Sequence, residues 1–118
     1  MALRMFTALM VAGLAALPAA GLAADTNVSG AELLARCEGT PQMQKVDQLY
    51  CKGYLEGIED YVAAGGVAKP FCVPAGGVTD GQLRETYMAW AKANAGALTQ
   101  PALTAAIAAF AAAYPCGK

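Results

Sequence analysis

Four cysteines constrain the fold of this 118-residue chain more than any other feature, because all of them follow an N-terminal segment typical of export. Cys37, Cys51, Cys72 and Cys116 are even in number and are separated by 14, 21 and 44 residues. In an oxidising compartment such cysteines usually form disulfides. Three pairings are possible, and we favour Cys37–Cys51 with Cys72–Cys116. Each bond would stabilise the domain by about 2–4 kcal/mol.

The N-terminal segment has the layout of a secretory signal. One basic residue precedes a long apolar run, and Pro18 and a small-residue stretch follow it. This layout predicts a signal peptide at residues 1–24, cleaved after Ala23 or Ala24, and one domain at residues 25–118. A membrane anchor is the alternative, since the apolar run is about long enough to span a bilayer. Pro18 and the lack of a flanking cluster of Lys or Arg favour cleavage.

Composition excludes several classes of function. Beyond residues 1–24 the chain has seven Lys and Arg against nine Asp and Glu, which is too acidic for nucleic-acid binding. The chain has no histidine, so Ser-His and Cys-His catalysis and the commonest zinc ligand are missing. The wide cysteine spacing does not suit a four-thiolate metal site. We therefore expect a protein-binding domain, with no enzymatic activity, cofactor or metal.

The remainder of the chain reads as an all-α, disulfide-stapled domain of four helices. No stretch alternates apolar and polar residues as a half-buried strand would. Two capping boxes, Ser29 with Glu32 and Thr79 with Gln82, predict the starts of two helices. Proline and glycine predict the remaining boundaries. The predicted helices span about 29–38, 40–64, 79–94 and 100–114.

Apolar residues at steps of three and four predict the buried helix faces. In the second helix these residues are Met43, Val46, Tyr50, Tyr54, Ile58, Tyr61 and Val62. In the third they are Leu83, Tyr87, Trp90 and Ala91, and in the fourth Leu103, Ile107, Phe110 and Tyr114. Gly53 and Gly57 lie four apart in the second helix, where each glycine costs about 1 kcal/mol relative to alanine. We expect another helix to cross very close to them.

Glu56, Glu59 and Asp60 form the tightest polar cluster, on the second helix. Paired carboxylates can perform acid–base chemistry or hold calcium. A solvated helix face opposite the apolar stripe explains the same pattern without any chemistry, and we favour that interpretation.

Three blocks of the chain resemble one known family. Residues 51–60, CKGYLEGIED, resemble a Cys-x-Gly-Tyr-x-x-Gly-x-x-Asp signature. A second block of the family is resembled by FCVP at residues 71–74, together with GVT at 77–79 and QL at 82–83. A third block is resembled by the closing YPC at residues 114–116. Together with LLARCE at 33–38 they occur in the family's order over nearly the whole mature chain. The chain resembles the Tai group of immunity proteins, which protect bacteria against peptidoglycan amidases injected by type VI secretion.

This resemblance implies a small periplasmic helical protein, often a homodimer, that binds a cysteine–histidine amidase effector and blocks its active site. The family signature supplies a helix-packing motif at Gly53, Tyr54, Gly57 and Asp60. We expect the contact to come from the loop at residues 65–77, which carries Lys69, Phe71 and Cys72, or from the acidic face of Glu56 and Asp60.

Two other functions fit the same sequence. The first is a periplasmic stress protein or chaperone that exposes apolar surface when its carboxylates lose charge at low pH. Two disulfides would resist such opening. The second is an orphan envelope module with no cognate toxin.

Overall fold

The computed structural model describes residues 28–65 and 68–117. Within these ranges the chain forms four α-helices and one short 3-10 helix: α1 (Gly30–Glu38), α2 (Gln44–Ala63), α3 (Asp80–Ala93), η2 (Ala95–Ala97) and α4 (Ala102–Ala113). No strand forms in this part of the chain, where Ser29 and Pro101 make one isolated bridge. The predicted all-α fold is therefore confirmed. The predicted signal peptide, residues 1–24, lies outside the described residues.

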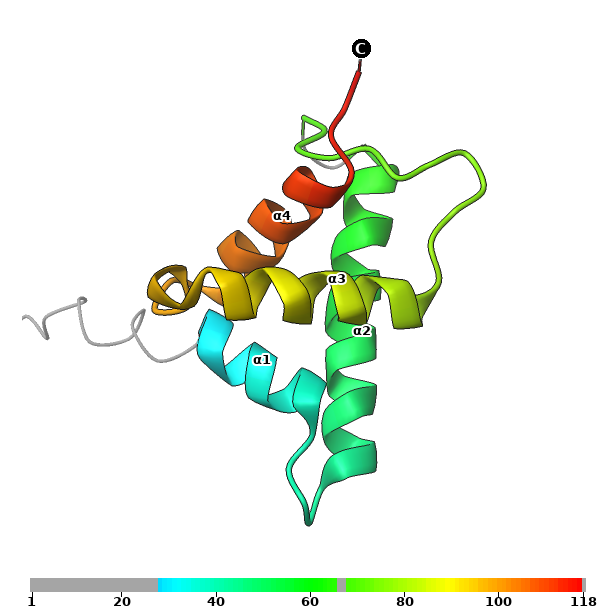
Figure 1. Ribbon diagram of the computed structural model, residues 1–118. Helices are drawn as coiled ribbons and strands as arrows, with labels where there is room; N and C mark the ends of the chain where they lie inside the picture. The colour runs from blue at the N-terminus through cyan, green and yellow to red at the C-terminus, as the bar shows by residue number, and fades with distance from the viewer. Residues whose placement is uncertain (1–27, 66–67, 118) are drawn as a thin grey trace, which may run out of the picture.

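The helices enclose a single core. Helix α3 runs across α2, with α1 on one side of α3 and α4 on the other, and all four contact one another (Figure 1). The largest fully buried side chains come from every helix and from the segment before α3: Tyr87, Phe71, Phe110, Leu33, Leu55, Leu83, Cys37 and Cys51. The starts of α1 and α4 are also joined, because the Ala102 N–H donates to the Val28 carbonyl at 2.7 Å.

Both predicted capping boxes are present. The Ser29 hydroxyl accepts from the Glu32 N–H at 3.1 Å, and the Glu32 carboxylate accepts from the Ser29 N–H at 3.0 Å. Thr79 and Gln82 repeat this exchange at the start of α3. Each box satisfies amide groups that have no partner within the helix, so the two starts are fixed locally.

Helix α2 begins later than predicted, at Gln44 rather than near Thr40. The Asp47 carboxylate accepts hydrogen bonds from the Thr40 N–H at 3.0 Å and from the Thr40 hydroxyl at 2.6 Å. The Met43 N–H donates back to the Thr40 carbonyl at 3.1 Å. These bonds hold residues 40–43 as a turn in front of the helix.

The predicted buried face of α2 is confirmed at Ile58 and Val62 but is wrong at most of its other positions. The buried residues are Asp47, Cys51, Leu55, Ile58 and Val62, whereas Met43, Val46, Tyr50 and Tyr61 are exposed and Tyr54 is half-buried. The inward row lies one residue further along than the predicted one, which rotates the helix by about 100°. The disulfide from Cys51 to α1 and the bonds to Asp47 require this rotation, because both residues must face inward.

The prediction of a close helix crossing at Gly53 and Gly57 is also wrong within this chain. A Cβ atom built at either position meets no atom within 4 Å. Both glycines lie on the exposed side of α2, as does Asp60 from the same signature. The close approach occurs instead at Gly30, where a Cβ would lie 3.1 Å from the Cβ of Ala105.

Helix α4 buries mainly its alanines, and this corrects the predicted apolar face. Ala102, Ala105, Ala106, Ala109 and Phe110 are buried, Leu103 is 49% exposed, and Ile107 and Tyr114 are half-buried. Small side chains on the inward face allow α1 and α3 to approach closely, which larger residues would prevent. No helix in the described part of the chain is long and apolar enough to cross a membrane.

Candidate functional site

Residues 68–79 lead into α3 and are called here the 68–79 loop. The first half of this loop is anchored to the rest of the domain. Cys72 forms a disulfide with Cys116, and its N–H donates to the Tyr114 carbonyl at 2.8 Å. Phe71 is 1% exposed and packs edge-on against Phe110, with ring centroids 5.3 Å apart. The loop is therefore held against the end of α4 by a covalent bond, a hydrogen bond and a buried ring.

The second disulfide supports the other end of the domain. Cys37 in α1 bonds to Cys51 in α2, and both residues are fully buried. The two bonds are the pairs favoured from the sequence, and no free cysteine occurs among the described residues. One bond thus holds α1 and α2 together inside the core, and the other holds the 68–79 loop and the C-terminal tail.

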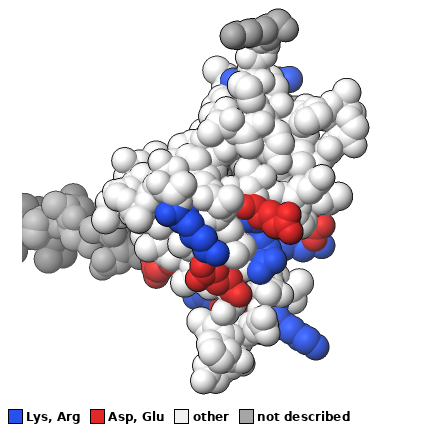
Figure 2. Space-filling model, viewed as in Figure 1, with Lys and Arg blue, Asp and Glu red and all other residues white. Residues whose placement is uncertain are grey.

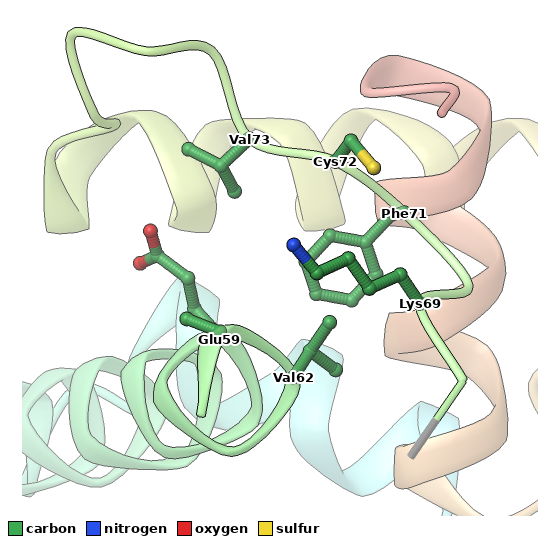
Figure 3. Close-up of a pocket in the computed structure, with 7 residues that line it drawn as sticks. Glu59, Val62, Lys69, Phe71, Cys72 and Val73 are labelled. Atoms are coloured by element: carbon green, nitrogen blue, oxygen red, sulfur yellow. The ribbon is translucent and has the colours of Figure 1, made fainter. Parts of the chain in front are cut away.

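A small cavity of about 180 Å³ lies between the loop and the C-terminal end of α2. Its lining residues are Glu59, Val62 and Ala63 from α2 and Lys69, Phe71, Cys72 and Val73 from the loop. In Figure 3 the Lys69 side chain passes in front of the Phe71 ring, and its ammonium group points toward the side where Glu59 stands. Apolar groups of Val62, Phe71 and Val73 therefore share the cavity with one acid and one base.

The acid of this cavity has a shifted pKa. Partial burial raises the pKa of Glu59, and the negative charges of Asp60 and Glu56 raise it further. Both causes disfavour the carboxylate form, since one removes water and the others repel like charge. None of the ion pairs in the described part of the chain involves these three acids. The α2 end of the site is an acidic patch, and Lys69 of the loop is the base that shares its cavity.

The structure brings together only some of the residues predicted for partner binding. Lys69 is exposed and lines the cavity, whereas Glu56 and Asp60 lie beside it on α2 without lining it. Phe71 forms part of the cavity wall and is buried against Phe110, and its contact with a partner stays a prediction. Glu59 was missed as a lining residue. No local signal marked it, because its position beside the loop follows from the rotation of α2.

The site offers shape and charge for binding. Among the residues described, no group of three or more Cys, Asp or Glu side chains is placed to hold a metal ion. On the face shown in Figure 2, charged side chains gather where α3 crosses α2, and the surface over the loop and α4 is largely uncharged. The loop thus presents a rigid, mostly uncharged surface next to a compact acidic patch.

Comparison with known families assigns the chain. A sequence model of the Rap1a immunity proteins matches residues 29–116, from the N-cap of α1 to the cysteine that closes the second disulfide. The chain belongs to the Rap1a immunity protein family. No curated protein and no solved structure matches it. Membership of the Rap1a family makes it an effector immunity protein, whose role requires binding a cognate effector. The matched range contains all four helices and the cavity.

Proposed function

We propose that this protein is a periplasmic immunity protein of the Tai type, which binds a peptidoglycan amidase delivered by type VI secretion and inhibits it. The observation that carries the proposal is the Rap1a family match over residues 29–116. The Tai-like motifs point to an amidase as the effector, and the signal-like segment at residues 1–24 points to the periplasm. The resemblance further implies a group of proteins that are often homodimers, and the lack of a catalytic constellation in the sequence indicates that this protein is not an enzyme.

The contact surface of this proposal is the 68–79 loop together with the cavity beside it. A loop already fixed by the Cys72–Cys116 disulfide loses little conformational entropy on binding, so more of its contact energy becomes affinity. The cavity is of the size that receives one anchoring side chain from a partner, the usual form of an interface hot spot. Lys69 and Glu59 at its edges would orient that side chain. Occlusion of an amidase cleft needs no catalytic group on this chain.

A rescue assay tests the function. A candidate amidase is exported to the periplasm of a sensitive host, and the full chain is co-expressed while lysis is followed. We expect protection that disappears when residues 1–24 are deleted. Lack of protection against a panel of type VI amidases would reject the amidase assignment.

The same assay tests the site. The paired substitutions Lys69→Glu and Val73→Asp place charge in and beside the cavity, and we expect them to abolish protection. Lys92→Glu, the same charge reversal on an exposed lysine of α3, is the matched control and should protect fully. Circular dichroism of the doubly substituted loop variant and of Lys92→Glu should show that each of them is folded. Full protection by the loop variant would reject this site and leave the immunity function intact.

A further inference from the structure

A second hollow lies between the first half of α2 and the first turns of α3, and we call it the basic hollow. It encloses about 500 Å³. Its lining residues are Lys45, Gln48, Leu49 and Lys52 from α2 and Asp80, Gly81 and Arg84 from α3. None of these residues lines the loop cavity, which lies at the other end of α2. The basic hollow is therefore a separate feature of the surface.

The basic hollow carries an excess of positive charge, since three bases and one acid line it. Charged side chains gather where α3 crosses α2 (Figure 2). Lys52 pairs with Asp80 at 3.3 Å, and both side chains are about half exposed, which makes this ion pair weak. Among the ion pairs of the described residues, none involves Lys45 or Arg84. Two of the three bases therefore have no acid of the described chain paired with them.

The Arg84 guanidinium is fixed from the interior side. Its Nε donates to the Cys37 carbonyl at 2.7 Å, in the last turn of α1. Cys37 is itself held by its buried disulfide to Cys51. The two Nη groups of Arg84 are left to donate, and a guanidinium suits a carboxylate because it can give two parallel hydrogen bonds. A base that is already positioned loses little conformational entropy when it binds an anion.

The spacing along α2 indicates the shape of the ligand. Lys45, Leu49 and Lys52 follow each other at steps of four and three, so they lie on one side of the helix. The helix advances about 10 Å from Lys45 to Lys52. An extended peptide advances about 3.3 Å per residue, so carboxylates three residues apart match this distance. Leu49 is 67% exposed between the two lysines, where it offers an apolar contact.

The start of α3 also favours negative charge, as its own acid shows. Lys52 lowers the pKa of Asp80 through a hydrogen bond and its charge, and the N–H groups of Gly81 and Asp80 add to this effect. Asp80 thus occupies the α3 end of the basic hollow. An incoming acid would meet the bases that Asp80 leaves unpaired.

We propose that the basic hollow binds a short acidic segment of another polypeptide. Its carboxylates are met by Lys45, Lys52 and the Nη groups of Arg84, and an apolar side chain between them covers Leu49. Lys52 can serve both Asp80 and the ligand because an ammonium group has three donors. An anionic membrane is a poorer match, since the whole chain has a net charge of −1 and presents its bases in a hollow. The inference goes beyond the proposed function and does not depend on the identity of the effector.

A peptide titration followed in ¹⁵N-resolved NMR spectra of the exported protein tests the proposal, because it detects weak binding and locates it. The probe is the capped peptide Ser-Asp-Leu-Ala-Asp-Ser, and the control peptide has Asn in place of both Asp residues. We expect the acidic peptide alone to shift the amide signals of Leu49, Lys52 and Gly81 to saturation. This binding should weaken as salt is added.

Charge reversal on the protein supplies the matched comparison. Lys45→Glu should raise the dissociation constant of the acidic peptide at least about fivefold. Lys92→Glu makes the same change on an exposed lysine of α3 outside the basic hollow and should bind as the native chain does. Leu49→Asn, which leaves the charges unchanged, should also weaken binding through loss of the apolar contact.

Several results would overturn the proposal. One is the absence of saturable shifts with the acidic peptide, and another is equal binding of the Asn peptide. Acetate that produces the same shifts at the same concentration would show a general anion site with no preference for a peptide. Binding of phosphatidylglycerol vesicles in place of the peptide would assign the basic hollow to a membrane surface. Equal effects of Lys45→Glu and Lys92→Glu would mean that net charge, and not this hollow, governs binding.

Discussion

The Tyr87 hydroxyl donates a 2.7 Å hydrogen bond to the Gly30 carbonyl in the interior, and so joins α3 to the first residue of α1. Gly30 also lies close to α4, and its N–H donates to the carbonyl of Gln100, just before that helix, at 2.9 Å. One buried ring therefore fixes the meeting point of three helices. The 68–79 loop leads into α3, whose position is fixed at this junction. The position of the candidate site therefore depends on the junction as well.

Replacement of Tyr87 by phenylalanine should destabilise the fold without creating a cavity. The ring remains, but the buried Gly30 carbonyl loses the donor from α3, and loss of one hydrogen bond costs about 0.5–1.5 kcal/mol. The free energy of unfolding in urea measures the loss. Equal free energies of unfolding for the native chain and Tyr87→Phe would contradict a role for the buried hydroxyl.

Alkaline pH should weaken the fold through the same residue. Burial raises the pKa of Tyr87 from its ordinary value of 10.0 to about 12, with a smaller contribution from Tyr54. Between these two values the unfolded chain releases the proton and the folded chain retains it, so stability is complete below pH 10 and falls as the pH rises toward 12. Between pH 10 and 12 the free energy of unfolding in urea should fall less steeply for Tyr87→Phe than for the native protein.

Acid should weaken the fold through Asp47. The hydroxyl and N–H of Thr40, followed by Arg36, lower the pKa of this buried carboxyl below its ordinary value of 3.8. A lowered pKa stabilises the folded state above the unfolded value, and this contribution is lost as the pH falls through the folded value. Asp47→Asn should be less stable at neutral pH, with a flatter decline in acid. Identical acid profiles for both proteins would contradict this role.

Local signals account for most of the fold that could be predicted. The capping boxes at Ser29 and Thr79 and the proline and glycine boundaries act within a few residues, so the sequence specifies them directly. The inward face of α2 was not predictable from apolar spacing, because two apolar rows compete on that helix. The choice is made by Asp47 and Cys51, whose partners lie in other segments of the chain.

The candidate site was predictable in position but not in detail. The loop composition and Cys72 located the segment, and Lys69, which was predicted to contact a partner, is exposed there. The burial of Phe71 depends on its packing against Phe110 in α4, which no local pattern encodes. Glu59 lines the cavity because the rotation of α2 brings it beside the loop, and that rotation is a tertiary effect.

The two disulfides should differ in their resistance to reduction. Cys116 is exposed and Cys72 half-buried, whereas Cys37 and Cys51 are fully buried. Thiol attack requires access to a sulfur atom, so a low concentration of dithiothreitol should open Cys72–Cys116 first. Alkylation followed by peptide mass spectrometry identifies the order. Earlier opening of Cys37–Cys51 would show that the core opens more readily than the loop.

The close contact at Gly30 predicts a large effect of one added methyl group. A Cβ there would lie 3.1 Å from the Ala105 Cβ and 3.2 Å from the Leu98 backbone, so two helices would have to separate. We expect Gly30→Ala to cost about 1–3 kcal/mol through overpacking, despite the higher helix propensity of alanine. Gly81→Ala is the matched control, since its Cβ meets only the Thr79 hydroxyl at 3.9 Å. Urea unfolding of both variants decides the point, and equal stabilities would mean that the α1–α4 contact is loose enough to absorb the methyl group.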